Sequence, residues 1–577
     1  MLQQAKTEPG PSSRPSPSLR ELFTPKLVTV LREGYGLPQL RADALAGLTV
    51  AIVALPLSMA IAIACGVSPD KGLATAIVGG FLISALGGSR FQIGGPAGAF
   101  IVLVAATIER HGYDGFLLAT MIAGLVLVLI GFLRLGTYIK YIPHPVTVGF
   151  SAGIAVIIMA SQFKELLGLT LSGPEPAALL PKIAALWEAR DTANGATIAL
   201  ALVSIGLIVL IRRIDARLPA FLIVVAATTL AAWAFGLPVE TIGSRFGEVP
   251  RGLPAPSLPD MTLDKVIAVL PDALAIALLG GIESLLSAVV ADGMTGRRHR
   301  SNCELVAQGV ANIASPLFGG LTATGTIART ATNVRAGAVG PVSGMLHAVF
   351  LLVFMIVAAP LAAYVPLAAL GAVLAVVAWN MAERHAFASI LTRSRGEAVV
   401  LLATFLLTIF RDLTEGIVVG VVIGSFLFMH RMGELVAVER HASLGMDDEA
   451  DAPAGAREAY DTERVANPDV VVYSIAGPLF FGAAGNVGAV LERIGSRPKA
   501  LVLDLSKVPF ADSTAARTLL SIAHETTRRG AQLYITGASP AVRRVLTHEG
   551  LKVPLVRYAA NVAAARDAAS RALATAA

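Results

Sequence analysis

Long stretches without a charged residue recur along most of the chain. The charge-free runs on the scale of a bilayer span are residues 44–69, 72–89, 115–133, 141–163, 192–211, 218–239, 336–382 and 416–430. A helix that crosses the hydrocarbon core of a bilayer needs about 20 mostly apolar residues. The longest run, 336–382, is long enough for two such helices and contains His347. The pattern predicts fourteen helical segments, some of them short, between about residue 44 and residue 432.

The composition supports a membrane protein. Hydrophobic residues make up 55% of the 577 residues and charged residues only 15%, whereas soluble domains are about 25% charged. Aromatic residues are only 6% and glycines number 55, which favours closely packed helices over a β-barrel with aromatic girdles. These values exclude a disordered chain, a fibrous protein and an ordinary cytosolic protein.

Basic residues concentrate on alternate loops, which predicts the orientation in the membrane. With the N-terminus inside, the inner loops carry the basic residues Arg90, Arg134, Lys140, Arg212, Arg213, Arg217, Arg297, Arg298, Arg300, Arg335, Arg384, Arg393, Arg395 and Arg431. The opposite loops are more acidic, so the positive-inside rule predicts a multi-pass protein of the cell (inner) membrane with both termini cytoplasmic. The net charge of +6 mostly reflects this bias. It does not support nucleic-acid binding.

The composition also divides the chain into parts. Residues 1–42 are expected to be a cytoplasmic tail, since the first 20 are Pro- and Ser-rich and lack the apolar core of a signal peptide. Residues 43–433 form the expected transmembrane domain. An acidic linker, 434–467, then leads to a soluble domain, 468–577.

The soluble domain alternates predicted strands and helices, which indicates a small α/β fold. Strands are expected at 470–475, 500–505 and 532–536, and helices at 485–494, 513–527 and 540–549, with Asp512 as an N-cap. The domain lacks a Gly-rich phosphate loop, clustered metal ligands and a nucleophile–base pair. We therefore do not expect an enzyme or a cofactor.

Two Gly-rich breaks, at 92–100 and 319–330, interrupt the apolar sequence. Each precedes a short helix, and they occupy corresponding places in the two halves, which points to a midplane site in an inverted-repeat transporter. A helix that begins inside the membrane presents unpaired N–H groups and a positive dipole end, and two such ends can bind an anion. Alternatively, the glycines only permit close helix packing. Two breaks at matching positions favour the anion site.

Glu283 lies in an apolar stretch, with Ser287 one helical turn further on the same face. Intramembrane carboxylates are costly and usually face a cavity or a partner. Glu283 and Ser287 could coordinate Na⁺, or Glu283 could carry a proton. Arg329 in the second break is a further costly charge. It either attracts the substrate anion or is a structural lock paired with Glu283 or a carbonyl.

Several motifs in order resemble the SulP family of anion transporters, the sulfate permease and solute carrier 26 type. They are Leu-Pro-Leu-Ser-Met-Ala at 55–60, Gly-Val-Ser-Pro at 66–69, Gly-Gly-Pro-Ala-Gly at 94–98, Ile-Glu-Ser-Leu-Leu-Ser-Ala at 282–288 and Ala-Thr-Gly-Thr-Ile-Ala-Arg-Thr at 323–330. The soluble domain resembles the family's STAS domain, with Asp-Leu-Ser at 504–506 and Asp-Ser-Thr-Ala at 512–515.

The resemblance implies an α-helical polytopic fold of seven plus seven inverted-repeat segments, with a core domain, a gate domain, a small cytoplasmic α/β STAS domain and a homodimeric assembly. It also implies a secondary active transporter of a small inorganic anion, of the sulfate or bicarbonate class, coupled to Na⁺ or H⁺. Alternatives are an uncoupled exchanger or channel and a C4-dicarboxylate transporter. Together with the arguments above, the expected coupling-ion residues are Glu283 and Ser287. The expected substrate-binding residues are Ala97, Gly98, Gly325, Thr326, Ile327 and Arg329.

Two positions depart from the family pattern. Leu57 stands where many relatives have Gln, and Thr322 where many have Pro. The choice among sulfate, bicarbonate, dicarboxylate and halide is therefore left open. Ser513 matches the serine that is phosphorylated in STAS proteins that antagonise anti-sigma factors, so it is a candidate phosphorylation site, with a plain helix-start residue as the alternative. The resemblance also suggests that the STAS domain binds a cytosolic protein partner.

Overall fold

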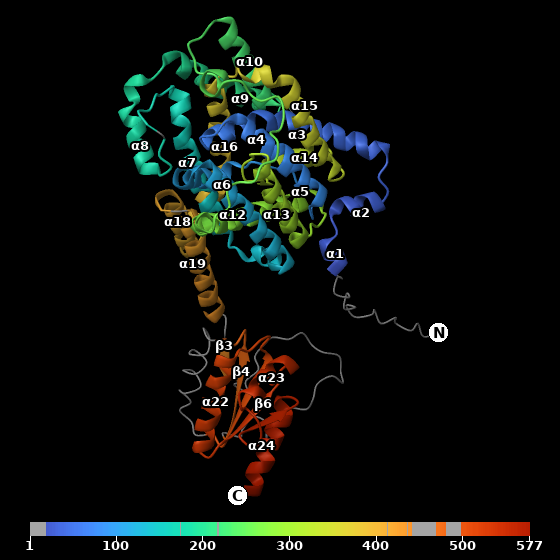
Figure 1. The fold of residues 1–577 in the computed structure, drawn as a ribbon. Coiled ribbons are helices and arrows are strands. Elements are labelled where there is room, and N and C mark those ends of the chain that lie inside the picture. Colours follow the sequence, from blue (N-terminus) through green and yellow to red (C-terminus); the bar gives the residue numbers. More distant parts are fainter. Residues whose placement is uncertain are drawn as a thin grey trace. The chain divides into compact units, whose positions relative to one another are not determined.

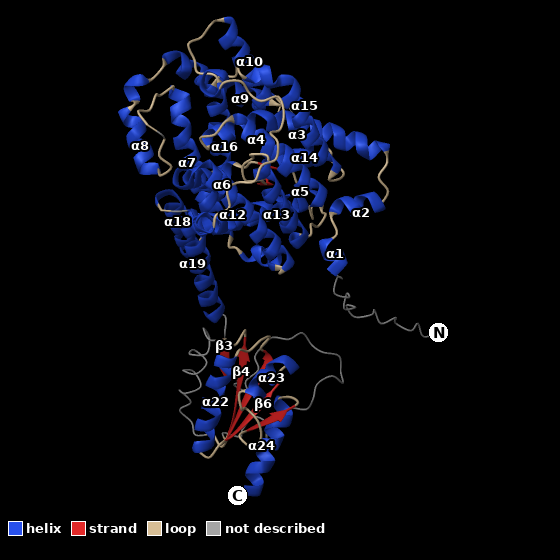
Figure 2. Ribbon diagram, in the orientation of Figure 1, coloured by secondary structure: helices blue, strands red, loops and turns tan. Residues whose placement is uncertain are grey.

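The structure is a computed structural model that describes residues 19–173, 175–215, 218–411, 413–434, 437–440, 469–480 and 498–576. The chain divides into two compact units, Met1–Val421 and Val422–Ala577. The first unit is almost entirely helical, and the second contains a five-stranded sheet (Figures 1 and 2).

The membrane region runs from Leu37 to Glu434. Its longer helices are α3 (Leu37–Ala64), α6 (Ile101–Phe132), α7 (His144–Leu167), α9 (Gly195–Ile214), α10 (Ala220–Ala234), α12 (Leu263–Thr295), α13 (Ser301–Leu317), α15 (Val342–Ala362), α16 (Leu367–Met381), α18 (Arg395–Phe410) and α19 (Leu413–Glu434). Shorter pieces are α4 (Pro69–Ala74), η1 (Thr75–Gly79), α5 (Gly80–Leu86), η2 (Gly98–Phe100), η3 (Leu135–Tyr141), α8 (Leu179–Glu188), η4 (Arg190–Thr192), α11 (Ile242–Phe246), α14 (Ile327–Arg335) and α17 (Arg384–Arg393).

Eight of the described helices are long and apolar enough to cross a membrane, judged by length and composition. Helix α6 changes direction at Gly112, whose φ of 69° is a backbone conformation that glycine adopts without strain. With α6 divided there, α4 to α5 taken as one segment and the short connecting helices left aside, the described membrane region holds fourteen segments. This agrees with the sequence prediction. The run 336–382 supplies α15 and α16, as expected.

The helix packing repeats between the two halves. We take α12 as the counterpart of α3, α13 of α5, α14 and α15 of the two parts of α6, and α16 and α18 of α7 and α9. Helix α3 packs on α15, and α12 packs on α6. Likewise α5 packs on α15 and α13 on α6, while α7 packs on α18 and α16 on α9. Each of these contacts between the halves therefore has an equivalent in which the two halves exchange roles, which is the pattern expected of a structural repeat.

The segment before the first span is helical and packed. Residues 19–42, expected to belong to a tail, form α1 (Leu19–Phe23), α2 (Lys26–Arg32) and the first turns of α3. Arg300 Nη1 donates a hydrogen bond of 2.6 Å to the carbonyl oxygen of Thr24. The Arg90 guanidinium pairs with Glu33 at 2.5 Å, and this hydrogen bond lowers the pKa of Glu33. Residues 1–18 lie outside the described part of the chain.

The second unit contains a mixed sheet in the order β3-β4-β5-β6-β7. Its strands are β3 (Ala437–Arg440), β4 (Val470–Ala476), β5 (Ala500–Lys507), β6 (Gln532–Thr536) and β7 (Val556–Ala559). Strand β3 is antiparallel to β4, and the other pairs are parallel. Helices α22 (Ser513–Arg528) and α23 (Pro540–His548) pack on one face of the sheet, and α24 (Val562–Ala576) packs on the other.

The structure confirms five of the six elements expected in this domain, including the N-cap. The carboxylate of Asp512 accepts a hydrogen bond of 2.8 Å from the backbone N–H of Ala515. The helix expected at 485–494 lies outside the described residues. Three elements were not expected: β7, α24 and β3, which lies in the range 434–467 assigned to the linker. Strands β3 and β7 have only four residues each, and α24 is an alanine-rich segment that packs on the sheet through Ala565 and Ala569.

Candidate functional site

The two Gly-rich breaks lie side by side. They form a two-stranded antiparallel ribbon of β1 (Gly94–Gly95) and β2 (Thr324–Gly325), in which Gly94 pairs with Gly325. The backbone N–H of Thr326 donates to the carbonyl oxygen of Ile93 at 3.0 Å and extends the pairing. The ribbon therefore joins two segments that are more than 200 residues apart in the sequence, and a helix follows each of its strands.

Two glycines of the ribbon permit a close approach of polar side chains. A Cβ at Gly325 would overlap the side-chain amide of Gln92, and a Cβ at Gly95 would overlap Nη1 of Arg329. Both Gln92 and Arg329 are buried. The absence of a side chain at these two positions is thus required by what packs against them, beyond general helix packing.

The two helices that follow the ribbon begin without side-chain caps. Ala97 precedes η2 and Thr326 precedes α14, and neither accepts a capping hydrogen bond at its helix. The hydroxyl of Thr326 instead donates to the carbonyl oxygen of Ile93 at 3.3 Å. The first N–H groups of both helices therefore have no side-chain cap, and each helix start carries the positive end of a helix dipole.

The surroundings of Gly98, at the start of the first of these helices, are apolar. A Cβ built on Gly98 would lie 3.5 Å from Cδ1 of Ile158 on α7 and 3.6 Å from Sδ of Met381 on α16. Ile327, the first residue of α14, has 38% of its surface exposed. An anion at this place would meet backbone N–H groups on one side and apolar side chains on the other.

Arg329 is buried behind the ribbon, with 1% of its surface exposed. Its Nη2 donates to Oγ of Ser58 at 3.1 Å and to the carbonyl oxygen of Pro96 at 3.3 Å. Among the described residues it has no carboxylate at ion-pair distance, and its Nε and Nη1 have no hydrogen-bond partner. The sequence allowed two partners for Arg329, Glu283 or a backbone carbonyl. In the structure the partner is the carbonyl oxygen of Pro96 and not Glu283. The guanidinium remains an unneutralised positive charge near the helix ends.

Glu283 and Ser287 lie on α12 beside the ribbon. The hydroxyl of Thr324 donates to the carbonyl oxygen of Gly280, one turn before Glu283, at 3.3 Å. Ser287 Oγ donates to Thr330 Oγ1 at 3.1 Å. Glu283 is half-buried, and its carboxylate makes no hydrogen bond or ion pair with another described residue. Its carboxylate is therefore available to a ligand.

A hard cation at Glu283 would need oxygen ligands beyond the carboxylate. The described residues contain no group of three or more His, Cys, Asp or Glu side chains that could hold a metal ion. Hydroxyl oxygens of Ser287 and Thr330 and the nearby carbonyl of Gly280 are of the right chemical type for Na⁺. The donor set fits a weakly held alkali cation better than a transition metal.

A second set of polar side chains holds the 319–330 break in place, and the sequence reasoning missed it. Asn312 on α13 donates its Nδ2 to the carbonyl oxygen of Ala323 at 2.7 Å and accepts that residue's N–H at 2.9 Å. The hydroxyl of Thr75 accepts the N–H of Leu321 at 2.6 Å. A sequence signal was present, because polar residues recur every fourth position on α13 at Glu304, Gln308 and Asn312.

The two positions that depart from the family pattern are both buried. Thr322 is buried, with its hydroxyl 3.3 Å from that of Thr120 on α6. Leu57 is also buried in α3. In the second unit, Ser513 is the exposed first residue of α22, directly after the capping Asp512. Its hydroxyl is therefore accessible to a modifying enzyme.

The helical repeat, the paired broken segments and the appended mixed sheet together define a multi-pass membrane transporter with a C-terminal STAS domain. The sequence pattern of the sulfate permease family matches residues 40–404, and that of the STAS domain matches residues 461–565. The family match spans more than half of the chain. The chain therefore belongs to the sulfate permease family.

Two relatives extend the likeness over almost the whole chain. "Putative sulfate transporter YvdB" of Bacillus subtilis (strain 168) is 40% identical over 524 residues, which cover 90% of this chain and 95% of the relative. "Bicarbonate transporter BicA" of Synechocystis sp. is 32% identical over 522 residues, covering 88% of this chain and 90% of the relative. Both relatives are described as transporters, which agrees with the prediction that this protein is not an enzyme.

Two solved structures share the fold. Murine Solute Carrier 26 family member A9 (Slc26a9), an anion transporter in the inward-facing state, superposes with a TM-score of 0.82 at 19% identity and covers 99% of both chains. The transmembrane domain of a cyanobacterium bicarbonate transporter, BicA, has a TM-score of 0.60 at 32% identity and covers 66% of this chain and 98% of that one. The predicted fold class is confirmed.

Proposed function

We propose that this protein is a secondary active transporter of a small inorganic anion, of the sulfate or bicarbonate class, driven by Na⁺ or H⁺. One observation carries the proposal. Two helices without side-chain caps begin shortly after the paired strands of the β1–β2 ribbon, and the buried guanidinium of Arg329 beside the ribbon has no carboxylate partner among the described residues. The names of the relatives, one a sulfate and one a bicarbonate transporter, support the substrate class.

The anion site is formed by the backbone at the two helix starts. Each helix N-terminus carries roughly half a positive elementary charge, and its free N–H groups point toward the ligand. The residues that supply this surface are Ala97, Gly98, Gly325, Thr326 and Ile327, with Arg329 adding a longer-range positive charge. Because most of the attraction comes from dipoles and one indirect charge, the anion is held without a direct ion pair and can leave again.

Two groups of helices provide the bodies for alternating access. Helices α3 to α6 and α12 to α15 pack among themselves around the ribbon, whereas α7, α9, α16 and α18 form the other group. Ile158 on α7 and Met381 on α16 face Gly98 across the boundary between the groups. Movement of one group against the other would expose the helix ends to one side of the membrane at a time.

Coupling follows from the charge of Glu283. An unpaired carboxylate near the helix ends repels an anion, and a bound Na⁺ or proton removes that repulsion. The cation and the anion therefore bind with positive cooperativity, and each raises the affinity for the other by the same factor. Ser287 and Thr330 contribute oxygens if the cation is Na⁺.

The proposal includes the setting of the transporter. We place it in the cell inner membrane as a homodimer, with both termini cytoplasmic. The STAS domain would then bind a cytosolic protein partner, and phosphorylation of Ser513 would alter that binding. Truncation of residues 445–577 separates this role from transport, since unimpaired uptake would assign the domain to regulation or assembly.

The test is uptake of radiolabelled sulfate and bicarbonate into proteoliposomes, with and without Na⁺ and pH gradients. We expect one cation gradient to drive uptake and Glu283→Gln to abolish that dependence. Asp264→Asn is the matched control, because Asp264 is an exposed carboxylate on the same helix. Wild-type coupling in Glu283→Gln would disprove the coupling role. Uptake that needs no cation gradient would favour the uncoupled exchanger.

A further inference from the structure

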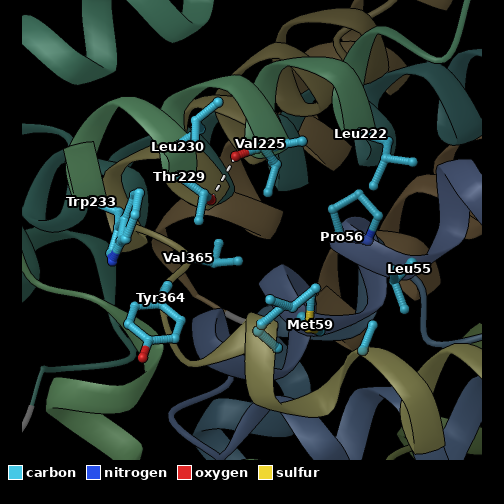
Figure 3. A pocket seen from close by; sticks show the side chains of 14 residues that line it. Leu55, Pro56, Met59, Leu222, Val225, Thr229, Leu230, Trp233, Tyr364 and Val365 are labelled. Carbon is cyan, nitrogen blue, oxygen red and sulfur yellow. Dashed lines mark hydrogen bonds between the residues drawn. The ribbon is translucent and has the colours of Figure 1, made fainter.

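An apolar cavity of about 590 Å³ opens between α3, α10 and α15. Its wall includes Pro56 and Met59 of α3, Ala226 and Thr229 of α10, and Ala358 of α15 (Figure 3). None of its lining residues is charged. The hydroxyl of Thr229 donates to the carbonyl oxygen of Val225 in its own helix at 2.6 Å, so it is satisfied within the wall.

One end of the cavity carries two amphipathic aromatic residues. Trp233 and Tyr364 lie at the same side of the opening in Figure 3, and 68% and 53% of their surfaces are exposed. Trp and Tyr concentrate where a membrane protein meets the headgroup region of the bilayer. The other exposed residues that line the cavity, Ala226, Leu230 and Leu361, are apolar.

We propose that this cavity binds an acyl chain of a membrane phospholipid, with the headgroup beside Trp233 and Tyr364. Two of the walls, α3 and α15, are long enough to span the membrane, and α10 is a shorter apolar helix. The opening therefore continues the surface that hydrocarbon chains cover. A cavity without charged groups offers nothing to a water-soluble ion, and an empty one forfeits dispersion contacts along its whole lining. The cavity is lined by residues of one protomer, and a single flexible acyl chain is of a suitable kind to fill it.

The cavity is connected to the anion site through one turn of α3. Pro56 and Met59 line the cavity, while Ser58 between them accepts the hydrogen bond from Arg329. Pro56 lacks the N–H that would bond to the carbonyl of Ile52, which makes this turn easier to bend. In addition, α10 packs on α9 and α16 of one helix group and also on α3 of the other group, to which α15 belongs as well. A lipid chain held between the groups favours the state in which the cavity is open.

The test uses full-length protein in liposomes that contain a phospholipid with a photoreactive diazirine on its acyl chain. After irradiation, mass spectrometry should find the lipid on peptides of α3, α10 and α15 that line the cavity. Ala226→Phe fills the cavity and should abolish these cross-links. The matched control is Ala227→Phe, because Ala227 is the next residue of α10, is exposed and does not line the cavity. It should keep them.

Two results would overturn the proposal. One is equal cross-linking in the wild type and Ala226→Phe. The other is a disulfide-linked dimer formed by Ala226→Cys in the membrane, which would show that a second copy covers this surface. A positive result should be accompanied by uptake rates that change with acyl-chain length in the wild type and lose that dependence in Ala226→Phe. The cross-linking result does not depend on the transported ion, so it stands or falls separately from the proposed transport function.

Discussion

The hydroxyl of Ser287 on α12 donates a hydrogen bond of 3.1 Å to the hydroxyl of Thr330 on α14. Thr330 in turn accepts the backbone N–H of Ile93, the residue before β1, at 3.1 Å. Three segments are thereby joined: the helix that carries Glu283, the helix that begins at the second break, and the first break itself. A shift of α12 at Glu283 can therefore be transmitted through these two hydrogen bonds to both breaks.

This relationship predicts the effect of Ser287→Ala. Loss of this hydrogen bond should lower the apparent affinity for the coupling cation roughly fivefold, which corresponds to about 1 kcal/mol. Uptake against Na⁺ concentration or pH in proteoliposomes measures it. Ser284→Ala is the control, because Ser284 donates only to the carbonyl of Gly281 in its own helix. Identical cation dependence in the two variants would contradict the prediction.

The ribbon glycines give a second prediction. In Gly325→Ala the new Cβ would overlap the buried amide of Gln92, so the ribbon must shift and anion uptake should be lost. Combining Gly325→Ala with Gln92→Ala removes the obstacle and should restore part of the uptake. Gly206→Ala on α9 should be harmless, because nothing lies within 4 Å of a Cβ there. If the double variant is no better than Gly325→Ala, the overlap is not the cause.

The helical fold could be predicted from the sequence because charge is so strictly excluded from the spans. The run 336–382 gave two helices and the strand periods gave β4, β5 and β6. The failures have a common physical cause. Helices α1 and α2 are short, and the segment that contains them is held by partners such as Arg90 and Arg300, which are distant in the sequence. The hydrophobic pattern within a short segment does not reveal its contacts with residues far away in the sequence.

The site could be predicted only in part. The glycine spacing and Glu283 identified both breaks and the facing helix. The pairing of Gly94 with Gly325 depends on how two halves of the chain meet, so its register could not be derived from either break alone. Asn312 was overlooked because a buried amide in an apolar helix has many structural explanations until its partner, Ala323, is known.

Arg329 offers a third prediction, which separates attraction of the anion from a structural lock. Arg329→Gln removes the charge, whereas Arg329→Lys keeps a charge but loses the paired donors to Ser58 and Pro96. If the charge attracts the anion, Gln should weaken anion binding by about 2 kcal/mol and Lys by clearly less. Isothermal titration with sulfate and bicarbonate measures the affinities. Equal losses in both variants, with equal falls in thermal stability, would assign Arg329 to the lock.

The pair of Glu33 and Arg90 predicts a pH effect on the segment before the first span. The hydrogen bond from Arg90 lowers the pKa of Glu33 below its ordinary value of 4.5. Because the pKa of Glu33 is lower when it is paired with Arg90, the pair stabilises the packed segment at pH values above the ordinary pKa. That contribution is lost as the pH falls through the lowered pKa. A nitroxide label introduced by Leu31→Cys, at an exposed position of α2, should become more mobile only in strong acid.

The matching variant for this experiment is Glu33→Gln, which cannot ionise. Its label should be more mobile at neutral pH than in the wild type, and its mobility should change little on acidification. Because Glu33 is half-exposed, solvent weakens the pair, and the effect at neutral pH should be modest. A label whose mobility is independent of pH in the wild type would show that this pair does not hold the segment.

The last prediction concerns the start of α22 in the STAS domain. Asp512→Ala removes the cap on the N–H of Ala515 and should destabilise the domain by about 1 kcal/mol, while Asp512→Asn should keep most of the stability. Ser513→Asp adds a second negative charge at the same helix end, where the dipole is favourable but the Asp512 carboxylate is adjacent. We expect Ser513→Asp to leave the domain folded, as a regulatory phosphate requires. Thermal unfolding of the full-length variants decides this, and loss of the fold in Ser513→Asp would exclude Ser513 as a switch.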